Sequence, residues 1–414
     1  MSNDNINWKS DFSDPSNALA FTTQFRKKTP KTLFVNGPPG SGKTSFLCRA
    51  AVQLAKRNRP VVCYTHWRSG DGFREELRKE ILAKGLPEES ENKIKVIVVK
   101  DQDVVQLQPL VKKKAIVIFD MLNFVPADFF LHFYHKHNVI ASFDCMQMFN
   151  KNQISAFYWL KTHPSESADE KFLVLTNSNR HVFFLLWSRN WLYRFKITGR
   201  GGNPHPTAHL YNVPRNNEDD YVEERKVLEI VTRLITEQNV NPEDIGVGAS
   251  KHQVGYINEV LLKSPTIEGV SKVKVYSMWE WQFEPQIRHF IYLLNTRQAT
   301  DKYMMFQQAM NIAVTRPIDG FHLVADVKVM EKDPSRRCKA FLQWIRGEPM
   351  IDPRAQGASN APPEAAPRPL EAKEPPKEPE NRILRLLRQG SVPAPAPQRV
   401  YKEVNRFLNI KWKD

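Results

Sequence analysis

A glycine-rich stretch of eight residues constrains the fold of this chain more than any other feature. Residues 37–44 fit the pattern G-x-x-x-x-G-K-[ST]; an apolar run at 32–35 precedes them, and apolar residues at helical spacing follow from Phe46 to Leu54. A strand, a glycine loop and a helix are the context that a phosphate-binding loop requires. The sequence therefore predicts a nucleoside triphosphate site. The alternative is a glycine-rich turn that binds nothing.

The residue types in this loop match the chemistry of phosphate binding. Glycines let backbone N–H groups approach phosphate oxygens, and the start of the following helix adds its positive dipole end. Lys43 is predicted to reach the β- and γ-phosphates, and the Thr44 hydroxyl to ligate Mg²⁺. The predicted cofactors are ATP and Mg²⁺. The predicted nucleotide-binding residues are Gly37, Pro38, Pro39, Gly40, Ser41, Gly42, Lys43, Thr44 and Ser45.

Charge and cysteine content limit the partners and the compartment. The 414 residues carry a formal net charge of +15, which favours an anionic partner, with nucleic acid first. A basic surface that serves solubility alone is the alternative. The four cysteines are scattered without a C-x-x-C pair, which argues against a zinc site or a disulfide framework.

The first residues of the sequence do not predict a secretory signal peptide. The first five residues are polar, and no run of about 18 apolar residues occurs. We therefore expect no membrane partner and a location in the cytoplasm or the nucleus.

Short β-branched runs alternate with amphipathic stretches from about residue 31 to residue 351. This alternation indicates an α/β fold in which helices cover parallel sheets, and the span is too long for one such sheet and suits two. The expected strands are 32–36, 61–65, 94–99, 115–119, 138–143, 172–176, 244–248, 272–277, 288–293 and 321–325.

The C-terminal part has a different composition. Proline and charge dominate residues 352–380, which predicts an extended linker without a core. Two short amphipathic stretches follow it, and each is too short to be a stable isolated helix. We expect the basic tail to bind a protein partner or RNA, or to dock on its own core.

Two predicted strands end in aspartate downstream of the glycine loop. The strand 115–119 leads into Asp120, where a Walker B carboxylate would hold Mg²⁺ through water, and the next strand leads into Asp144. One aspartate at a strand end means little. Two on successive strands after a phosphate-binding loop favour an NTPase.

These and later elements together resemble superfamily 1 helicases, closest to the branch of the nonsense-mediated-decay RNA helicase. The 143–147 stretch, Phe-Asp-Cys-Met-Gln, is similar to G-D-x-x-Q, and 175–180 resembles L-x-x-x-Y-R. Residues 311–316, Asn-Ile-Ala-Val-Thr-Arg, are similar to N-V-A-L-T-R, while 242–262 and 274–282 resemble the two elements that come between. The elements follow the family order over residues 31–326.

The resemblance implies two tandem RecA-like P-loop domains with parallel sheets. The expected divisions are an N-terminal segment at 1–30, a first RecA-like domain at 31–165, a second at 166–350, a Pro-rich linker at 351–380 and a basic tail at 381–414. Only 120 − 44 = 76 residues separate Thr44 from Asp120, which leaves no room for the barrel domain that relatives insert there.

The resemblance also implies catalytic roles. Thr44 and Asp120 would hold Mg²⁺, and Gln147 would sense the γ-phosphate. Arg180 and Arg316 would reach it from the second domain as arginine fingers, which place fixed positive charge where negative charge develops. Taken singly, Gln147 and Arg180 are equally compatible with ordinary surface positions.

Departures from the family pattern weaken the expected hydrolysis. Met121 stands where the family has the glutamate that positions the attacking water, and loss of such a group lowers a rate by ~10²–10⁴. Phe283 replaces a glycine, Pro317 replaces a small residue, and Ala-Ser-Lys-His at 249–252 replaces T-P-Y.

The resemblance places nucleic-acid contacts at Thr65, Trp67, Arg68 and Ser277. An aromatic ring beside an arginine suits base stacking and phosphate pairing, although Trp67 equally suits packing at a domain interface. The aromatic residues Trp279, Trp281 and Phe283 are expected in the core.

Three functions remain open from the sequence. The favoured one is a nucleotide-dependent module that closes on single-stranded nucleic acid, RNA before DNA, with weak or lost hydrolysis. An active helicase or translocase is the second, and Met121 counts against it. A non-catalytic scaffold that acts through its tail is the third, and the intact P-loop counts against it.

Overall fold

The computed structural model describes most of the chain up to residue 347. All described residues belong to one compact unit, which ends before residue 360. The predicted linker and tail therefore lie outside the described residues. These are 10–12, 14–25, 31–85, 87, 92–99, 115–134, 136–147, 155–162, 169–180, 197–199, 207–214, 221–264, 267–294, 303–332 and 336–347.

The first sheet has six parallel strands in the order β3-β2-β4-β5-β1-β6. Strands β1 and β3 have the predicted bounds; β2, β4 and β5 differ from the prediction by one residue at one end, and β6 lies two residues earlier than predicted. Nearly all residues of the central strands are buried, as expected for a parallel sheet that is covered on both faces. The strands are β1 (Thr32–Asn36), β2 (Val61–His66), β3 (Ile94–Val99), β4 (Ile116–Phe119), β5 (Val139–Phe143) and β6 (Glu170–Val174).

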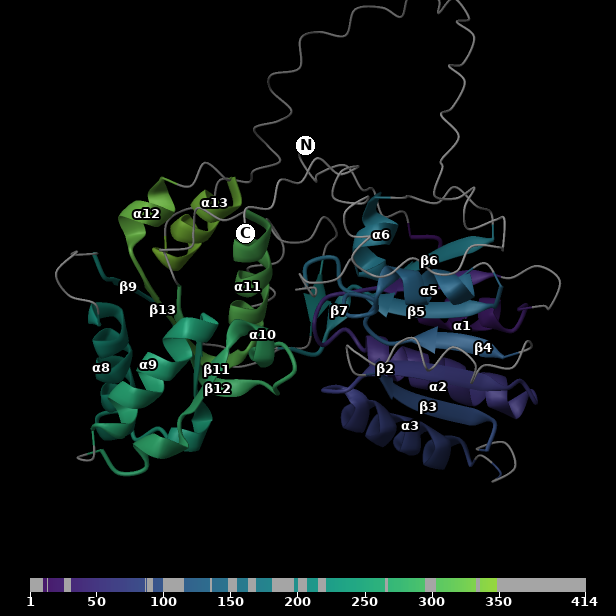
Figure 1. The fold of residues 1–414 in the computed structure, drawn as a ribbon, viewed down its shortest axis with the longest axis horizontal. Coiled ribbons are helices and arrows are strands. Elements are labelled where there is room, and N and C mark those ends of the chain that lie inside the picture. Colours follow the sequence, from purple (N-terminus) through teal and green to yellow (C-terminus); the bar gives the residue numbers. More distant parts are fainter. Residues whose placement is uncertain are drawn as a thin grey trace, which may run out of the picture. The chain divides into compact units, whose positions relative to one another are not determined.

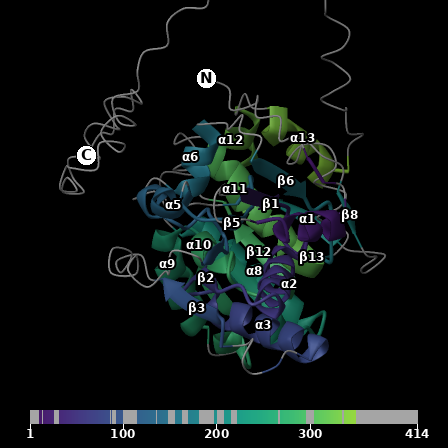
Figure 2. The same ribbon diagram turned by 90° about the vertical axis from the view of Figure 1, so that its right-hand side faces the viewer.

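Alternate residues of β1 belong to different hydrophobic clusters of the first sheet. Figure 1 shows the strands and helices of this sheet. Leu33 and Val35 pack with α1 (Pro15–Thr22), α2 (Lys43–Lys56) and α3 (Gly70–Lys84). Phe34 packs with α5 (Ala127–Tyr134) and α6 (Ala156–Thr162). Figure 2 shows α2 beside α3, and the two helices contact each other on the same face of the first sheet.

Two observed contacts cross the predicted domain divisions. The strand β6 pairs with β1, so the first sheet extends beyond the expected division at residue 165. Helix α1 contributes Ala18 and Phe21 to the core of the first sheet, so this helix packs with the first sheet although it precedes the predicted start of the domain at residue 31. The sequence pattern did not reveal the pairing of β6 with β1, because about 140 residues separate the two strands.

The second sheet has five parallel strands in the order β11-β10-β12-β13-β9. The edge strand β9 was not predicted, because its residues, Thr-Ala-His-Leu-Tyr-Asn, include three polar ones and it is only partly buried. The strands are β9 (Thr207–Asn212), β10 (Ile245–Ala249), β11 (Lys274–Ser277), β12 (Ile287–Leu293) and β13 (Pro317–Ala325). A short pair, β7 (Asn177–Ser178) and β8 (Thr198–Gly199), lies outside both sheets.

Helices also cover both faces of the second sheet. One face packs against α8 (Val222–Thr236) and α9 (Lys251–Leu262). The other packs against α10 (Met278–Trp281), α11 (Tyr303–Thr315) and α13 (Arg336–Ile345). The remaining short helices are η3 (Pro242–Asp244), η4 (Val270–Lys272) and α12 (Val327–Glu331).

Glycines on β10 bring α10 close to the second sheet. A Cβ at Gly246 would lie 2.6 Å from the Trp281 ring, and one at Gly248 would lie 2.5 Å from the Met278 sulfur. Trp281 is 1% exposed, and its indole N–H donates to the Val247 carbonyl at 2.7 Å. The expectation that Trp281 belongs to the core is confirmed.

The architecture is therefore α/β, with two all-parallel sheets that are each covered on both faces, as in two tandem RecA-like domains. In the described part of the chain, we find no helix with the length and apolar character needed to cross a membrane.

Candidate nucleotide site

The glycine loop connects β1 to α2, as the sequence pattern predicts. Gly40 and Gly42 adopt φ angles of 77° and 83°, a backbone region that favours glycine. Helix α2 begins at Lys43, whose ammonium group donates to the carbonyls of Gly37 at 2.7 Å and Pro38 at 3.0 Å. Burial lowers the pKa of Lys43, and the carboxylates of Asp144 and Asp120 oppose that effect.

A buried carboxylate lies beside the start of α2. Asp120 is 1% exposed, and its Oδ1 accepts hydrogen bonds from Ser142 Oγ at 3.1 Å and Thr44 Oγ1 at 3.5 Å. Its Oδ2 has no hydrogen-bond partner among the described residues. Burial raises the pKa of Asp120 from 3.8 to about 6, against the hydrogen bond from Ser142 and the charge of Lys43.

This arrangement fits a divalent cation. A free carboxylate oxygen and a nearby hydroxyl are hard oxygen ligands of the kind that Mg²⁺ prefers. The described residues contain no group of three or more His, Cys, Asp and Glu side chains able to hold a metal. Bound Mg²⁺ would therefore also need oxygen ligands from phosphate or water.

Met121 follows Asp120 in an unusual backbone conformation. Its φ is 64°, which is uncommon for a residue with a side chain, and its N–H donates to Ser142 Oγ at 3.0 Å. The side chain lines the cavity described next. A thioether is a weak acceptor and takes up no proton, so no general base stands at this position.

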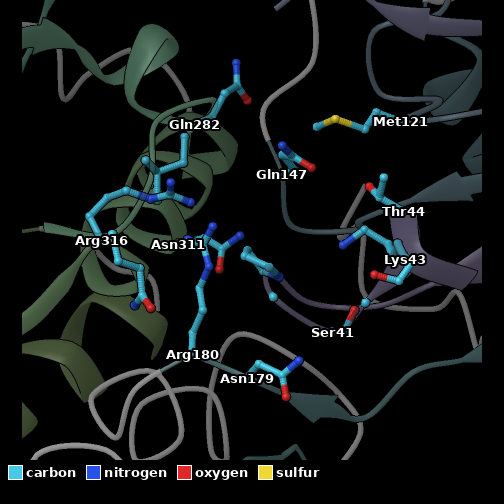
Figure 3. A pocket seen from close by; sticks show the side chains of 16 residues that line it. Ser41, Lys43, Thr44, Met121, Gln147, Asn179, Arg180, Gln282, Asn311 and Arg316 are labelled. Carbon is cyan, nitrogen blue, oxygen red and sulfur yellow. The ribbon is translucent and has the colours of Figure 1, made fainter. Parts of the chain in front are cut away.

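A cavity of about 560 Å³ extends from the glycine loop to residues near the second sheet (Figure 3). Its volume is in the range of small-molecule sites. Three of its lining side chains are cations, namely Lys43, Arg180 and Arg316, and no carboxylate is among the described residues that line it. The others are Pro39, Gly40, Ser41, Gly42, Thr44, Ser45, Met121, Gln147, Asn179, Gln282, Gln286, Asn311 and Ile312.

Arg316 is a buried cation in this cavity. It is 2% exposed; its guanidinium donates to the Glu284 carbonyl, while its Nε has no hydrogen-bond partner among the described residues. Burial and the nearby charge of Arg180 lower the pKa of Arg316, and the more weakly acting charge of Glu284 opposes them. Because a buried cation is costly without a close counter-charge, an anionic ligand would relieve this site.

Arg180 was predicted to reach the site from the second domain, but the residues directly before it contact the glycine loop. The Asn179 N–H donates to the Gly40 carbonyl at 3.0 Å, and Ser178 Oγ donates to the Pro39 carbonyl at 2.9 Å. The segment before Arg180 is thus tied to the glycine loop. The guanidinium itself donates to the Thr315 carbonyl at 3.1 Å, directly before Arg316 in the chain.

Gln147 follows β5 and lines the cavity, and its role at the γ-phosphate stays a prediction. It is 8% exposed, and its N–H donates to the Asp144 carbonyl at 3.1 Å. The neighbouring Met146 carbonyl accepts from the Asn311 amide at 3.2 Å, which joins this turn to α11. The structure therefore brings Lys43, Thr44, Gln147, Arg180 and Arg316 to one cavity, with Asp120 beside it.

Two of the predicted nucleic-acid contacts are buried. Thr65 is 1% exposed and bonds with Ser69 Oγ at 3.1 Å, and its hydrogen bond to Asp120 lowers the pKa of that carboxyl. Ser277 is 8% exposed, and its hydroxyl and N–H form a capping box with Glu280 at the start of α10. Neither side chain offers a surface to a strand in this structure.

Trp67 is exposed and Arg68 is partly exposed, which is compatible with the nucleic-acid prediction. The Trp67 side chain is 43% exposed, and the Arg68 guanidinium lies 4.7 Å from the centre of its ring. Arg68 also forms an ion pair with Glu280 at 3.5 Å. The prediction that these two residues contact nucleic acid remains a prediction.

Aromatic rings connect the two sheets beside Trp67. His66 stacks on Phe283 at 5.0 Å between ring centres, and Phe124 packs edge-on against Trp279 at 5.4 Å. Phe283 occupies the position where the helicase pattern has glycine. The Phe283 ring supplies the aromatic contact with His66, which a glycine at this position could not make. Trp279 and Phe283 are partly exposed, so they form this junction and not a buried core.

Sequence reasoning missed four polar residues of the cavity: Asn179, Gln282, Gln286 and Asn311. The resemblance offered a partial signal, because all but Gln286 fall inside stretches that are similar to helicase elements.

No protein-family model and no curated protein matches the chain. Among solved structures, the crystal structure of arterivirus nonstructural protein 10, a helicase, matches with 13% identity and a TM-score of 0.43 over 80% of this chain and 64% of that one. Its complex with DNA matches with 13% identity and a TM-score of 0.44 over 79% and 65%. The PRRSV helicase matches with 13% identity and a TM-score of 0.39 over 76% and 55%. The chain thus spans less than two thirds of the length of these helicases, and likenesses at this level carry no functional argument.

Proposed function

We propose that this chain is a superfamily 1 helicase-like protein that binds a nucleoside triphosphate with Mg²⁺ and, in that state, engages single-stranded nucleic acid. The observation that supports nucleotide binding best is the convergence of Lys43, Arg180 and Arg316 on one cavity beside a phosphate-binding loop. No described carboxylate lines that cavity, so its charge favours a polyanion.

The Thr44 hydroxyl and the free Oδ2 of Asp120 would hold Mg²⁺. When bound, the ion would neutralise charge on the phosphate oxygens. Lys43 would exchange its carbonyl partners Gly37 and Pro38 for phosphate oxygens, and Arg316 would gain a close counter-charge. Binding energy at this site comes from these charge pairs.

We propose that hydrolysis is slow. Met121 stands beside Asp120, where a general base would be expected, and cannot accept a proton. An active helicase or translocase is the alternative function, and a scaffold that acts through the tail at 381–414 is the further one. The three predict different turnover and different binding.

The nucleic-acid partner is proposed to be single-stranded, with RNA before DNA. The formal charge of +15 and the exposed stack of Trp67 and Arg68 support a site of this kind. Affinity for single strands should fall steeply as salt rises, because phosphate binding releases counterions. If the affinity did not change with salt, the net positive charge would not contribute to nucleic-acid binding.

Nucleotide binding can be tested with a fluorescent ATP analogue and Mg²⁺, using the wild type and Lys43→Ala. We expect the variant to bind at least about tenfold more weakly, because one charge-assisted contact, on the order of 1.5–3 kcal/mol, is lost. Equal binding by both proteins, or no binding by the wild type, would reject the proposed function.

Turnover with and without single-stranded RNA and DNA separates the slow module from the active helicase. Turnover on the order of 10 s⁻¹, a typical enzyme value, would reject slow hydrolysis. The variant Met121→Glu should raise turnover if the missing base limits the wild type. An unchanged rate would place the limit elsewhere in the site.

A further inference from the structure

One glutamine in the cavity has no internal partner for its amide. Gln282 is 7% exposed, and neither its Nε2 nor its Oε1 has a hydrogen-bond partner among the described residues. Leaving a buried polar group unpaired costs about 1–3 kcal/mol, and this amide has two such atoms. A side chain of this kind is either a local defect or a ligand contact that awaits its ligand.

The backbone that holds Gln282 is firmly anchored. It follows α10, whose first turn is fixed by the capping box between Ser277 and Glu280. The residue directly before it, Trp281, is buried and donates to the Val247 carbonyl on β10. The position of Gln282 is thus determined by the core of the second sheet, which is the support that a precise contact requires.

Gln282 lines the same cavity as Lys43, Thr44, Met121 and Gln147. In the view of Figure 3, the side chains of Gln282, Gln147 and Met121 lie toward the top, and that of Asn179 lies at the bottom. The nearby Gln286 differs from Gln282, because its amide already donates to the Thr315 carbonyl at 3.2 Å.

We propose that Gln282 holds the attacking water against the terminal phosphate of the bound nucleotide, the positioning task that Met121 cannot perform. This inference rests on the proposed function. An amide can accept a hydrogen bond from the water and donate one to a phosphate oxygen, and glutamines orient the attacking water in other P-loop proteins.

The reaction at this site is hydrolysis of the triphosphate. The water oxygen forms a bond to the γ-phosphorus, the bond from that phosphorus to the β–γ bridging oxygen breaks, and the diphosphate leaves with the electron pair. The protons of the water go to the phosphate product and the solvent. Gln282 takes up no proton, so its contribution is orientation without base catalysis, which agrees with slow turnover.

The test replaces the amide by a side chain of similar volume, Gln282→Met, in the full-length protein. We compare the affinity for ADP with the affinity for ADP and aluminium fluoride, which imitates the phosphoryl group in transfer, and we measure single-turnover hydrolysis. Removal of one transition-state contact lowers rates by about 10²-fold. We therefore expect a loss of about 10²-fold in hydrolysis and in the aluminium fluoride complex, with ADP affinity within about threefold.

A matched control is Gln253→Met. Gln253 is similarly buried at 8% exposure, but it lies on α9 and its side chain bonds with Ser250 and Glu223. This control should lower the melting temperature and leave hydrolysis unchanged. A second variant, Gln282→Asn, keeps the amide but retracts it by one carbon, so it should reproduce the losses of Gln282→Met if reach matters.

A double-mutant cycle with Met121→Glu separates water positioning from a general effect on the site. If the introduced carboxylate supplies the base, Gln282→Met should reduce hydrolysis less in the Met121→Glu background than in the wild type. Undetectable hydrolysis by the wild type, or equal aluminium fluoride binding by Gln282→Met, overturns the inference and leaves nucleotide binding intact. Failure of the wild type to bind any nucleotide overturns the proposed function together with this inference.

Discussion

The buried carboxylate of Asp120 should destabilise the protein when the nucleotide is absent. Its pKa is raised from 3.8 to about 6 by burial, so the folded state binds more protons than the unfolded state between these two pH values. The free energy of unfolding therefore falls as the pH rises through this window. A pKa difference of about 2, at about 1.4 kcal/mol for each unit, gives a penalty of about 3 kcal/mol at pH 7.5.

The variant Asp120→Asn removes the charge but keeps an oxygen that can accept from Ser142 Oγ. We expect it to raise the melting temperature of the nucleotide-free protein at pH 7.5, with up to about 3 kcal/mol of added stability. Near pH 4 the wild-type carboxyl is largely protonated, and the two proteins should melt at similar temperatures. Stability gained at the expense of a functional carboxylate is a common trade-off.

The assay is thermal unfolding of both proteins at the two pH values, without nucleotide and then with ATP analogue and Mg²⁺. Added ligand should stabilise the wild type and not the variant, because the variant lacks the carboxylate that would hold Mg²⁺. A variant that is destabilised equally at pH 7.5 and pH 4 would refute the reasoning, since the charge would then have no cost in the folded state.

Two further substitutions test the geometry of the site and its support. Gly40→Ala should abolish nucleotide binding in the ATP-analogue assay. The φ angle at this position is 77°, and the new Cβ would lie 2.6 Å from Arg180 Cγ. Binding by the variant within threefold of the wild-type affinity would contradict this prediction. Trp281→Phe keeps the aromatic packing but leaves the Val247 carbonyl without its indole donor. It should lower the free energy of unfolding by about 1–3 kcal/mol in urea titrations, and an unchanged urea midpoint would show that the hydrogen bond contributes nothing.

Local patterns predicted most of the fold correctly. Strand β1 and the start of α2 follow from an apolar run, a glycine loop and helical spacing, all of which lie within about 25 residues. Strand β6 was expected near its observed position, but its partner, β1, was not, because pairing across about 140 residues leaves no local pattern. The edge strand β9 has a partly polar sequence, which gives no strong strand signal.

The same limit applies to the site. Lys43, Thr44 and Asp120 were predictable because strand ends and loop spacing place them. The sequence did not show that Thr65 turns toward Asp120, since the orientation of a buried hydroxyl depends on its neighbours in space. Gln282 looks like any polar residue among aromatics in the sequence, and only the packing of α10 shows that its amide is buried without a partner among the described residues.

The stacked rings of His66 and Phe283 have a mechanical consequence for any working cycle. If the halves of the protein move apart when nucleotide leaves, this contact and that of Phe124 with Trp279 must separate and become hydrated. Sliding would keep the rings in touch, whereas wide hinge opening would forfeit about 0.5–1.5 kcal/mol for each ring pair beyond the apolar area exposed. Separation of these rings would therefore cost free energy that a sliding movement would not.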